Sequence, residues 1–344
     1  MMTPWILRSM LGLALVAGLT TAAEARPVKV KHGTLAPKGS PWFNGMQKVG
    51  ERWKKVSGGK VTLRIYPGGV AGDEGDMIRK MRIGQLHAAT VTNIGLSRIT
   101  RDSVALQIPM MFSSYEELDY VRERIAPRIE KALFDAGNDD PKNGVVVLQW
   151  GDAGWVHFFS KDKAVSPDDI RKTKLFVWAG DPEAEAAWRM SNFNVVPMSA
   201  TDVLSGLQTG MVESFSTAPV YALTSQWFGL AKHMVAIKWA PLNGATIISR
   251  ATWEKIPAEL RPQLKKIAEE EGEAVKKEVR SLGQRAIDEM AKRGLTIHQV
   301  DAKTQTEWQQ AAEKAYPALR GKVVSAELFD EVKRLVEEYR KSKK

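Results

Sequence analysis

The sequence contains no cysteine among its 344 residues, and this absence removes several classes of function. Disulfide scaffolds, thiolate-bound Fe–S clusters, cysteine nucleophiles and a lipid anchor on an N-terminal cysteine all need the missing thiol. Histidine is scarce as well, with five residues in the chain (His32, His87, His157, His233 and His298). No two of them have the spacing of a His-Glu-x-x-His or His-x-His site. The sequence therefore predicts no metal site and no cofactor.

The motifs that mark common catalytic sites are also missing. There is no Gly-x-Ser-x-Gly, no P-loop and no Gly-x-Gly-x-x-Gly. The adjacent carboxylates at 269–271 lie on the polar face of an expected helix, where solvation explains them better than acid–base chemistry. We therefore expect no catalytic residue and a protein that is not an enzyme. An exported hydrolase would need a nucleophile and a base that the sequence does not offer.

Positive charge is concentrated in one part of the chain. The formal net charge is +10, and residues 26–113 hold 15 basic and 5 acidic side chains. Nucleic-acid binding is rejected, because no basic run is interleaved with stacking aromatic residues. Three interpretations stay open: docking to an acidic face of a membrane partner, attraction of an anionic solute, and simple solvation.

The first 25 residues have the pattern of a secretory signal peptide. Arg8 precedes a mostly apolar run at 10–19, and Ala23 and Ala25 place small residues where a signal peptidase cuts, before Arg26. A retained anchor is the weaker alternative, because about ten apolar residues are too few to span a bilayer comfortably. No later segment approaches 18 uninterrupted apolar residues. We expect a soluble, periplasmic mature protein with cleavage near Ala25.

Strand-like and helix-like segments alternate along the rest of the chain, with glycine and proline turns between them. Such alternation predicts an α/β fold in which helices cover the sheets. The segments 81–89 and 207–215 resemble each other, which suggests two lobes of similar design. The expected strands are 28–35, 61–66, 87–91, 145–148, 155–160, 175–178, 195–196 and 212–215, and the expected shorter helices follow Pro41 and span 73–83, 182–190, 201–207 and 327–339.

The longest expected element is a helix at 252–293. Its roughly 30 helical residues, at 1.5 Å each, form a rod of about 45 Å, longer than one small domain is wide. A coiled-coil partner is one explanation, but Gly272 and Gly283 interrupt a strict heptad. A helix that lies across both lobes explains the length better.

Several segments, taken in order, resemble the solute-binding proteins of TRAP (tripartite ATP-independent periplasmic) transporters of the DctP type. The stretches are 33–42 (GTLAPKGSPW), 61–74 (VTLRIYPGGVAGDE), 108–117 (IPMMFSSYEE), 196–203 (VPMSATDV) with 207–213 (LQTGMVE), and 253–257 (WEKIP). The resemblance covers nearly all of the expected mature chain.

This resemblance implies a two-lobed periplasmic-binding-protein fold (type II-like) with a hinge and a long spine helix. Lobe I would comprise 26–152 plus about 240–270, and lobe II 153–239, with the spine and C-terminal helices of 271–344 packing across both. The protein would bind a small-molecule ligand and deliver it to the membrane subunits of a TRAP transporter. Presentation of the ligand to a membrane sensor is the alternative, and dimerisation through the late helices stays open.

The chain departs from this family where the ligand is expected. The family usually places an arginine in the strand at 175–178, where its fork would hold a ligand carboxylate, but this chain has Phe176. A second arginine position falls at about Val156. The resemblance and the aromatic replacements together suggest these ligand-binding residues: Trp42, Asn93, Trp155, Val156, Phe176, Trp178, Phe215, Thr217 and Trp239.

Two ligand classes remain open from these departures. The first is a less polar or aromatic solute, for which the aromatic side chains would form an apolar cleft. The second is an organic acid held by another cation, such as Arg64, Arg98 or Arg101 of lobe I. Any one of the aromatic residues could instead be an ordinary core residue on a strand.

Overall fold

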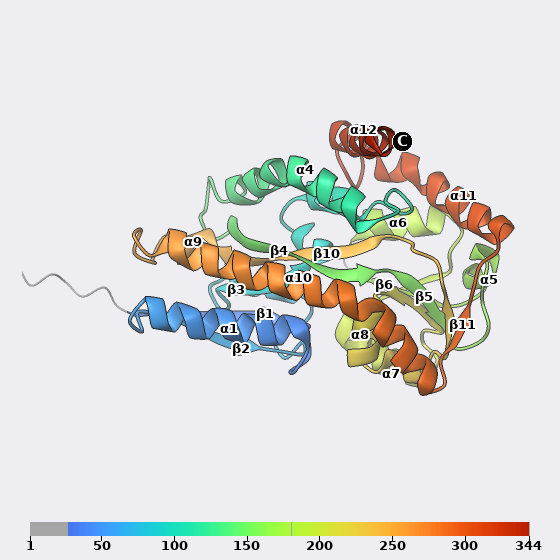
Figure 1. The fold of residues 1–344 in the computed structure, drawn as a ribbon, viewed down its shortest axis with the longest axis horizontal. Helices are drawn as coiled ribbons and strands as arrows, with labels where there is room; N and C mark the ends of the chain where they lie inside the picture. The colour runs from blue at the N-terminus through green and yellow to red at the C-terminus, as the bar shows by residue number, and fades with distance from the viewer. Residues whose placement is uncertain (1–26, 180, 344) are drawn as a thin grey trace, which may run out of the picture.

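The computed structural model describes residues 27–179 and 181–343. The expected signal peptide at 1–25 lies outside them. Two mixed β-sheets lie side by side, each covered by helices (Figure 1). The first has the strand order β2-β1-β3-β10-β4, and the second β11-β9-β5-β8-β6-β7. The two-lobed α/β prediction is therefore confirmed.

The strands of the first sheet are β1 (Val28–Thr34), β2 (Val61–Tyr66), β3 (Ala88–Thr92), β4 (Val145–Trp155) and β10 (Pro241–Ser249). Those of the second are β5 (His157–Ser160), β6 (Leu175–Trp178), β7 (Val195–Met198), β8 (Ser214–Thr217), β9 (His233–Val235) and β11 (Thr296–His298). In the first sheet β1, β2 and β3 are parallel, and β10 runs antiparallel to both β3 and β4.

The helices, with three short 3₁₀ turns labelled η, are α1 (Pro41–Val56), α2 (Glu74–Arg82), α3 (Asn93–Leu96), η1 (Arg101–Gln107), α4 (Tyr115–Asp135), α5 (Pro167–Arg171), α6 (Pro182–Met190), η2 (Ala200–Asp202), α7 (Val203–Thr209), α8 (Pro219–Thr224), η3 (Trp227–Gly229), α9 (Arg250–Trp253), α10 (Arg261–Lys292), α11 (Ala302–Leu319) and α12 (Ala326–Ser342).

Three chain segments pass between the sheets; one runs through α9 and α10 to β11, and the other two are bonded to each other. One passes from β4 through Val156 into β5, and the other from β9 through residues 236–240 into β10. The amide of Val156 donates to the carbonyl of Ala240 at 2.8 Å, and the amide of Trp239 donates to the carbonyl of Val156 at 2.9 Å. These paired crossings form a two-stranded connection between the lobes.

Helix α10 lies diagonally across both sheets in Figure 1. It packs against α1 on one side and α8 on the other, so the expected spine helix is present. It begins at Arg261 rather than 252, because Pro257 excludes the helical conformation from the residue before it and separates off α9. Gly272 also has a packing role, since a Cβ there would lie 2.3 Å from Oε1 of Gln149 on β4.

Some element boundaries differ from the sequence predictions. β4 continues to Trp155 because it pairs with β10 along its length, whereas two separate strands at 145–148 and 155–160 were expected. β8 begins at Ser214 rather than 212, because Val212 still belongs to the turn after left-handed Gly210. No helix was predicted for α4 or α11, each of which contains an internal proline, Pro127 and Pro317.

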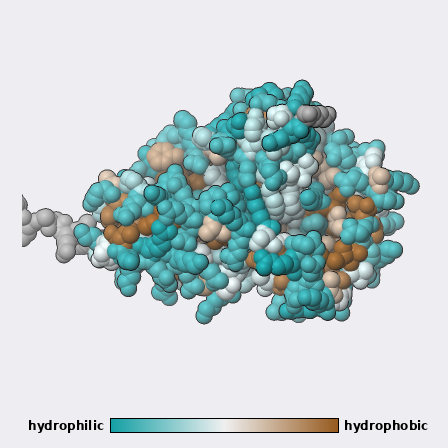
Figure 2. All heavy atoms as spheres, in the orientation of Figure 1, coloured by the Kyte–Doolittle hydropathy of each residue, from teal (hydrophilic) through white to brown (hydrophobic). Residues whose placement is uncertain are grey.

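The face that carries α1 and α10 is mostly hydrophilic, with small separate apolar areas (Figure 2). Among the described residues, no helix combines the length and the apolar character needed to cross a membrane.

Candidate functional site

Two cavities lie between the sheets. The first has a volume of about 170 Å³ and the second about 90 Å³. Trp178 on β6 and Leu242 on β10 line both cavities, so these two side chains separate them. Both sheets contribute to each lining, which places the cavities where two hinged lobes would enclose a ligand.

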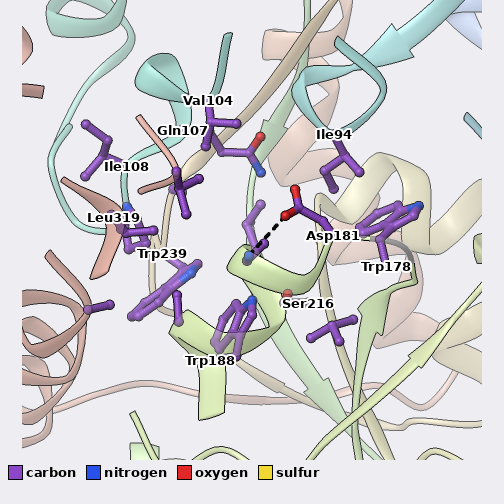
Figure 3. Close-up of a pocket in the computed structure, with 18 of the residues that line it drawn as sticks. Ile94, Val104, Gln107, Ile108, Trp178, Asp181, Trp188, Ser216, Trp239 and Leu319 are labelled. Carbon is purple, nitrogen blue, oxygen red and sulfur yellow. Dashed lines mark hydrogen bonds between the residues drawn. The ribbon is translucent and has the colours of Figure 1, made fainter. Parts of the chain in front are cut away.

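The first cavity extends from the edge of the sheets to the C-terminal helices. Figure 3 shows Ile94 and Trp178 on one side of the view and Ile108 and Leu319 on the other. Trp188 on α6 stacks on Trp239 with ring centroids 5.7 Å apart, and both rings line the cavity. The lining also includes Val104, Pro109, Val156, Phe176, Phe193, Ala311, Ala315, Val323 and Val324.

A buried amide pair joins the linings of the two cavities, with Asn93 in the first and Asn243 in the second. Asn243 donates from Nδ2 to the carbonyl oxygens of Leu106 at 2.9 Å and Pro241 at 3.4 Å, which fixes the orientation of its amide. Its Oδ1 then accepts from Nδ2 of Asn93 at 2.6 Å. The Oδ1 of Asn93 consequently has no partner, although the residue is 0% exposed and lines the cavity. Such an atom is costly unless a ligand donates to it.

Phe176 and Trp178 bring a flat apolar surface from β6 to the same cavity. Their ring centroids lie 5.0 Å apart, and Phe176 also meets Trp227 edge-on at 6.1 Å. The Nε1 of Trp178 is buried and has no acceptor. Four buried polar atoms from this lining therefore have no hydrogen-bond partner: Oδ1 of Asn93, Nε1 of Trp178, Oε1 of Gln107 and Oγ of Ser191.

The second cavity contains a buried carboxyl group. Glu74 at the start of α2 accepts hydrogen bonds from the amide and hydroxyl of Thr92, at 2.9 and 2.8 Å, and from the amide of Gly95 at 2.8 Å. Burial raises the pKa of Glu74 to about 7, against the lowering effect of those donors. Trp42, whose Nε1 donates to the carbonyl of Asp152 at 3.0 Å, lies in the same lining.

Neither interlobe cavity has a lysine, arginine or histidine in its described lining. The three arginines considered as alternative anchors for an acid contact other groups. Arg64 lies over the ring of Tyr66 on strand β2, which is the edge of its sheet. Arg98 donates to the carbonyl of Ala179 at 2.8 Å. Arg101 pairs with Glu183 at 2.7 Å and approaches Asp181 at 3.8 Å.

Contacts across the cleft hold the lobes together. The Arg98 and Arg101 bonds both reach from the first sheet's side to residues that follow β6. A third contact joins the lobes where Oδ2 of Asp73 accepts from the amide of Ala200 at 2.9 Å. The structure therefore represents a closed arrangement of the two lobes.

The sequence-predicted ligand residues fall into three groups. Asn93, Val156, Phe176, Trp178 and Trp239 line the first cavity, and Trp42, Trp178 and Thr217 line the second.

Trp155 and Phe215 line neither cavity. Trp155 packs against Tyr115, with ring centroids 5.4 Å apart, and Phe215 stacks on Phe159 at 4.9 Å in the core of the second sheet. The geometry places both in packing roles, because neighbouring residues on a strand face opposite sides of the sheet.

Sequence reasoning missed several residues of the first cavity. Trp188 had no motif around it, although it lies in a correctly predicted helix, and Asn243 of the second cavity had none either. The residues of α11 that line the cavity, Ala311, Ala315 and Leu319, belong to a helix that was not predicted. Their spacing of four along the helix is the signal that could have identified one face.

The described residues include no group of three or more histidine, aspartate and glutamate side chains arranged to hold a metal ion. The two most buried histidines are poor cation sources, because burial lowers the pKa of His32 to about 3 and of His157 to about 4. The linings offer apolar walls, a few uncharged polar atoms and four carboxyl groups, from Asp181 and Glu185 in the first cavity and Glu74 and Asp152 in the second. Asp181, Glu185 and Asp152 already have partners, so the site suits binding rather than acid–base catalysis.

Comparison with known proteins identifies relatives along most of the chain. The sequence profile of the family described as bacterial extracellular solute-binding protein, family 7 (DctP) matches residues 32–322. The C4-dicarboxylate-binding periplasmic protein DctP of Rhodobacter capsulatus is 24% identical over 317 residues, covering 90% of this chain and 92% of the relative. The sialic acid-binding periplasmic protein SiaP of Vibrio cholerae is 21% identical over 320 residues, covering 91% and 97%.

Solved structures show the same fold. A TRAP periplasmic solute-binding protein from Ralstonia eutropha with bound (S)-2-acetolactate superposes with a TM-score of 0.82 at 19% identity, covering 90% of this chain and 99% of the other.

Proposed function

The chain belongs to family 7 of the bacterial extracellular solute-binding proteins, and we propose that the solute it captures is uncharged where it meets the cleft, with an apolar or aromatic body. As a member of this family the protein is a periplasmic, non-enzymatic component of a TRAP transporter that works with its membrane subunits. The nature of the ligand is the part that we propose.

The observation that carries the proposal is the lack of any basic side chain in the described linings of both interlobe cavities. A carboxylate enclosed there would lose water without gaining a cation. A hydrogen bond to a charged group contributes about 1.5–3 kcal/mol, and leaving the charge unpaired costs at least that much. Glu74, with a pKa of about 7, adds a carboxyl group that repels an anion when ionised.

The side chains present suit a different ligand. Phe176, Trp188 and Trp239 provide apolar and aromatic walls. Asn93 and Trp178 each leave one polar atom free for a hydrogen bond to an uncharged group. We propose Asn93, Val156, Phe176, Trp178 and Trp239 as ligand contacts in the first cavity, and Trp42 and Thr217 in the second.

We further propose that the two lobes open around the paired segments at Val156 and 236–240. This hinge divides the chain near the expected boundaries, with 26–152 and about 240–270 in lobe I and 153–239 in lobe II. Dimerisation through the late helices stays a prediction.

The proposal is tested by identifying what the protein carries. Native mass spectrometry of protein purified from the periplasm should show an uncharged or weakly polar adduct. Calorimetric titration should then show binding of that compound and no binding of succinate or galacturonate at millimolar concentration. A carboxylate adduct, or tight succinate binding, would overturn the proposal and favour the organic-acid alternative.

Phe176→Arg provides a matched variant for this test, because it places a cation at the position that the family resemblance assigns to arginine. We expect it to gain succinate binding and to lose the natural ligand. If the wild-type protein already binds succinate as tightly as this variant does, the aromatic substitution has no bearing on ligand choice.

A further inference from the structure

Positive charge is concentrated in the first supersecondary unit of lobe I, which comprises β1, α1 and β2 (residues 28–66). Its residues include nine lysines and arginines and one acidic residue, Glu51. The adjoining helix α10 is also highly charged, but it contains eight basic and seven acidic residues. A surface that needs only solvation ordinarily mixes both signs of charge, as α10 does. Solvation alone therefore does not explain the β1–α1–β2 unit.

Most of this positive charge has no partner within the protein. Arg52 pairs with Glu270 and Glu271 of α10. The other basic side chains of the unit are exposed, and none of them forms an ion pair with another described residue. They are Lys29, Lys31, Lys38, Lys48, Lys54, Lys55, Lys60 and Arg64. These charges are available to an external anion.

Two of these lysines, Lys38 and Lys54, line a pocket of about 530 Å³ between α1 and β2. The α1 residues of the lining recur every three or four positions from Phe43 to Lys54, so the pocket follows one face of the helix for about 16 Å. Arg52, two residues before Lys54, points the other way and contacts α10, which lies along α1 in Figure 1. The pocket therefore lies on the side of α1 that faces away from α10.

This α1–β2 pocket combines an apolar floor with basic side chains around it. Phe43 and Met46 of the lining are buried, and Leu63 and Ile65 of the edge strand β2 are half-buried. Glu51 is the one acidic residue in the described lining. An apolar floor beside unpaired lysines is complementary to a protein segment that carries both apolar and acidic side chains.

The α1–β2 pocket adjoins the cleft between the lobes. Met46 lines both this pocket and the second interlobe cavity. Pro67, also in the lining, begins a loop in which the amide of Gly69 donates to the carbonyl of Thr34, another residue of the second cavity, at 3.1 Å. A Cβ on Gly69 would lie 2.7 Å from Cγ2 of Thr201 in lobe II. A protein bound in the pocket would therefore lie beside the place where the two lobes meet.

Neither an anionic solute nor a lipid surface accounts for these features together. Met46 separates the pocket from the second cavity, and neither interlobe cavity has a basic residue in its described lining. An anionic lipid surface would attract the lysines but would gain nothing from the apolar floor between α1 and β2. An acidic segment of another protein would use both.

We propose that the α1–β2 pocket and the lysines around it form a docking site for an acidic segment of the membrane subunits of the transporter. The site would hold these subunits beside the cleft from which they receive the solute. This inference goes beyond the proposed function and does not depend on which solute the cleft accepts.

The test measures binding of the mature protein to its own membrane subunits, held in nanodiscs of uncharged phosphatidylcholine, by surface plasmon resonance. The double variant Lys38→Glu/Lys54→Glu should bind at least about tenfold more weakly, mainly through slower association, because it reverses the charge that steers the partner. Wild-type affinity should fall about tenfold between about 50 and 500 mM NaCl. Unchanged binding by the double variant, or no wild-type binding at about 0.1 mM, would overturn the inference.

Lys314→Glu/Lys322→Glu is the matched control, because both lysines are exposed and the change in net charge is the same. It should change the affinity for the subunits less than twofold. Equal weakening by both double variants would assign the effect to net charge and overturn the docking site. Glu51→Lys should strengthen binding about threefold, since it removes the acidic side chain of the pocket. Thermal unfolding of all variants should remain unchanged, because the substituted side chains are exposed.

Two further measurements distinguish this site from its alternatives. Empty nanodiscs that contain phosphatidylglycerol should bind the wild-type protein at least tenfold more weakly than the subunits do. Equal binding to these empty nanodiscs, lost in Lys38→Glu/Lys54→Glu, would identify a lipid surface as the occupant and overturn the inference. Native mass spectrometry should find the same carried solute on this variant as on the wild type, because neither lysine lines an interlobe cavity. Loss of the solute would assign the lysines to solute capture instead of docking.

Discussion

The amide of Asn243 fixes the orientation of the amide of Asn93. Because two backbone carbonyls accept from Nδ2 of Asn243, its Oδ1 must accept from Asn93 at 2.6 Å. Oδ1 of Asn93 is then buried without a partner. Asn243, which lines the second cavity, thus determines which atom of the Asn93 amide in the first lacks a partner. An acceptor favours a ligand that donates a hydrogen bond and disfavours a carboxylate.

Asn93→Leu should weaken binding of the protein's own ligand by about tenfold, because one hydrogen bond contributes on the order of 1–1.5 kcal/mol. The free energy of unfolding should also fall by about 1–3 kcal/mol, since Oδ1 of Asn243 loses its donor in a buried position. Calorimetric titration and urea unfolding measure the two effects separately. Unchanged ligand affinity in the folded variant would show that Asn93 does not contact the ligand.

Phe176 and Phe215 provide a comparison between a cavity wall and a core residue. Phe215→Ala should lower the free energy of unfolding by about 3–5 kcal/mol, because the residue is fully buried against Phe159. Ligand affinity of the folded protein should change less than twofold. Phe176→Ala should also destabilise the protein, but it should weaken ligand binding at least tenfold. Urea unfolding and calorimetry distinguish the two cases, and equal ligand affinity in both variants would place Phe176 in the core alone.

The sequence predicted the order of many elements and left much of the site undetermined. β1, α1, β2 and α2 could be predicted because strand and helix patterns depend on residues that are close together in the chain. Pro41 and Gly84 mark ends of these elements. The acceptor of Asn93 depends on Asn243 and on the carbonyl of Leu106, which lies 137 residues from Asn243. No local pattern encodes that contact.

Phe215 shows a second limit of sequence reasoning. It lies on a short strand beside Ser216 and Thr217, which line the two cavities. An aromatic side chain on such a strand can line a ligand cleft or pack in the core. Only the packing of the two sheets determines which face of the strand lies towards the ligand. For the same reason the sequence did not show that α11 lines the first cavity, because its alanines are also typical of any helix.

Asp152 should be essential for stability at the junction of α4, β4 and α10. It is almost fully buried and accepts from Nη1 of Arg122 and from Nε of Arg280, both at 2.6 Å. Asp152→Asn should lower the free energy of unfolding by about 1–3 kcal/mol, because two largely buried guanidinium groups lose one of the two carboxylates that they share, while Asp119 still pairs with both. Urea unfolding measures this change.

Glu270→Gln is the control for that variant. Glu270 pairs with Arg52 on the exposed side of the same helix α10, so its replacement should leave the urea midpoint unchanged. A similar shift of the urea midpoint in both variants would mean that the Asp152 network contributes no more to stability than a surface ion pair does.

Glu74 should stabilise the folded protein more at acidic pH than at neutral pH, which is the opposite of acid unfolding. Burial raises its pKa to about 7 from the ordinary 4.5, so the folded protein binds a proton more tightly than the unfolded chain does. The resulting stabilisation is complete below about pH 4.5 and is lost as the pH rises to about 7. A shift of this size corresponds to a change on the order of 3 kcal/mol in the free energy of unfolding.

Buried His32 and His157 act in the other direction, because their pKa values are lowered to about 3 and about 4 and their contribution is lost as the pH falls below 6.5. Comparing the wild-type protein with Glu74→Gln cancels these histidine contributions. The wild-type free energy of unfolding minus that of Glu74→Gln should fall between pH 4.5 and 7.5 in urea unfolding. Glu278→Gln, exposed on α10, should show no such trend. A difference that stays constant over this range would mean that Glu74 is ionised in the folded protein throughout.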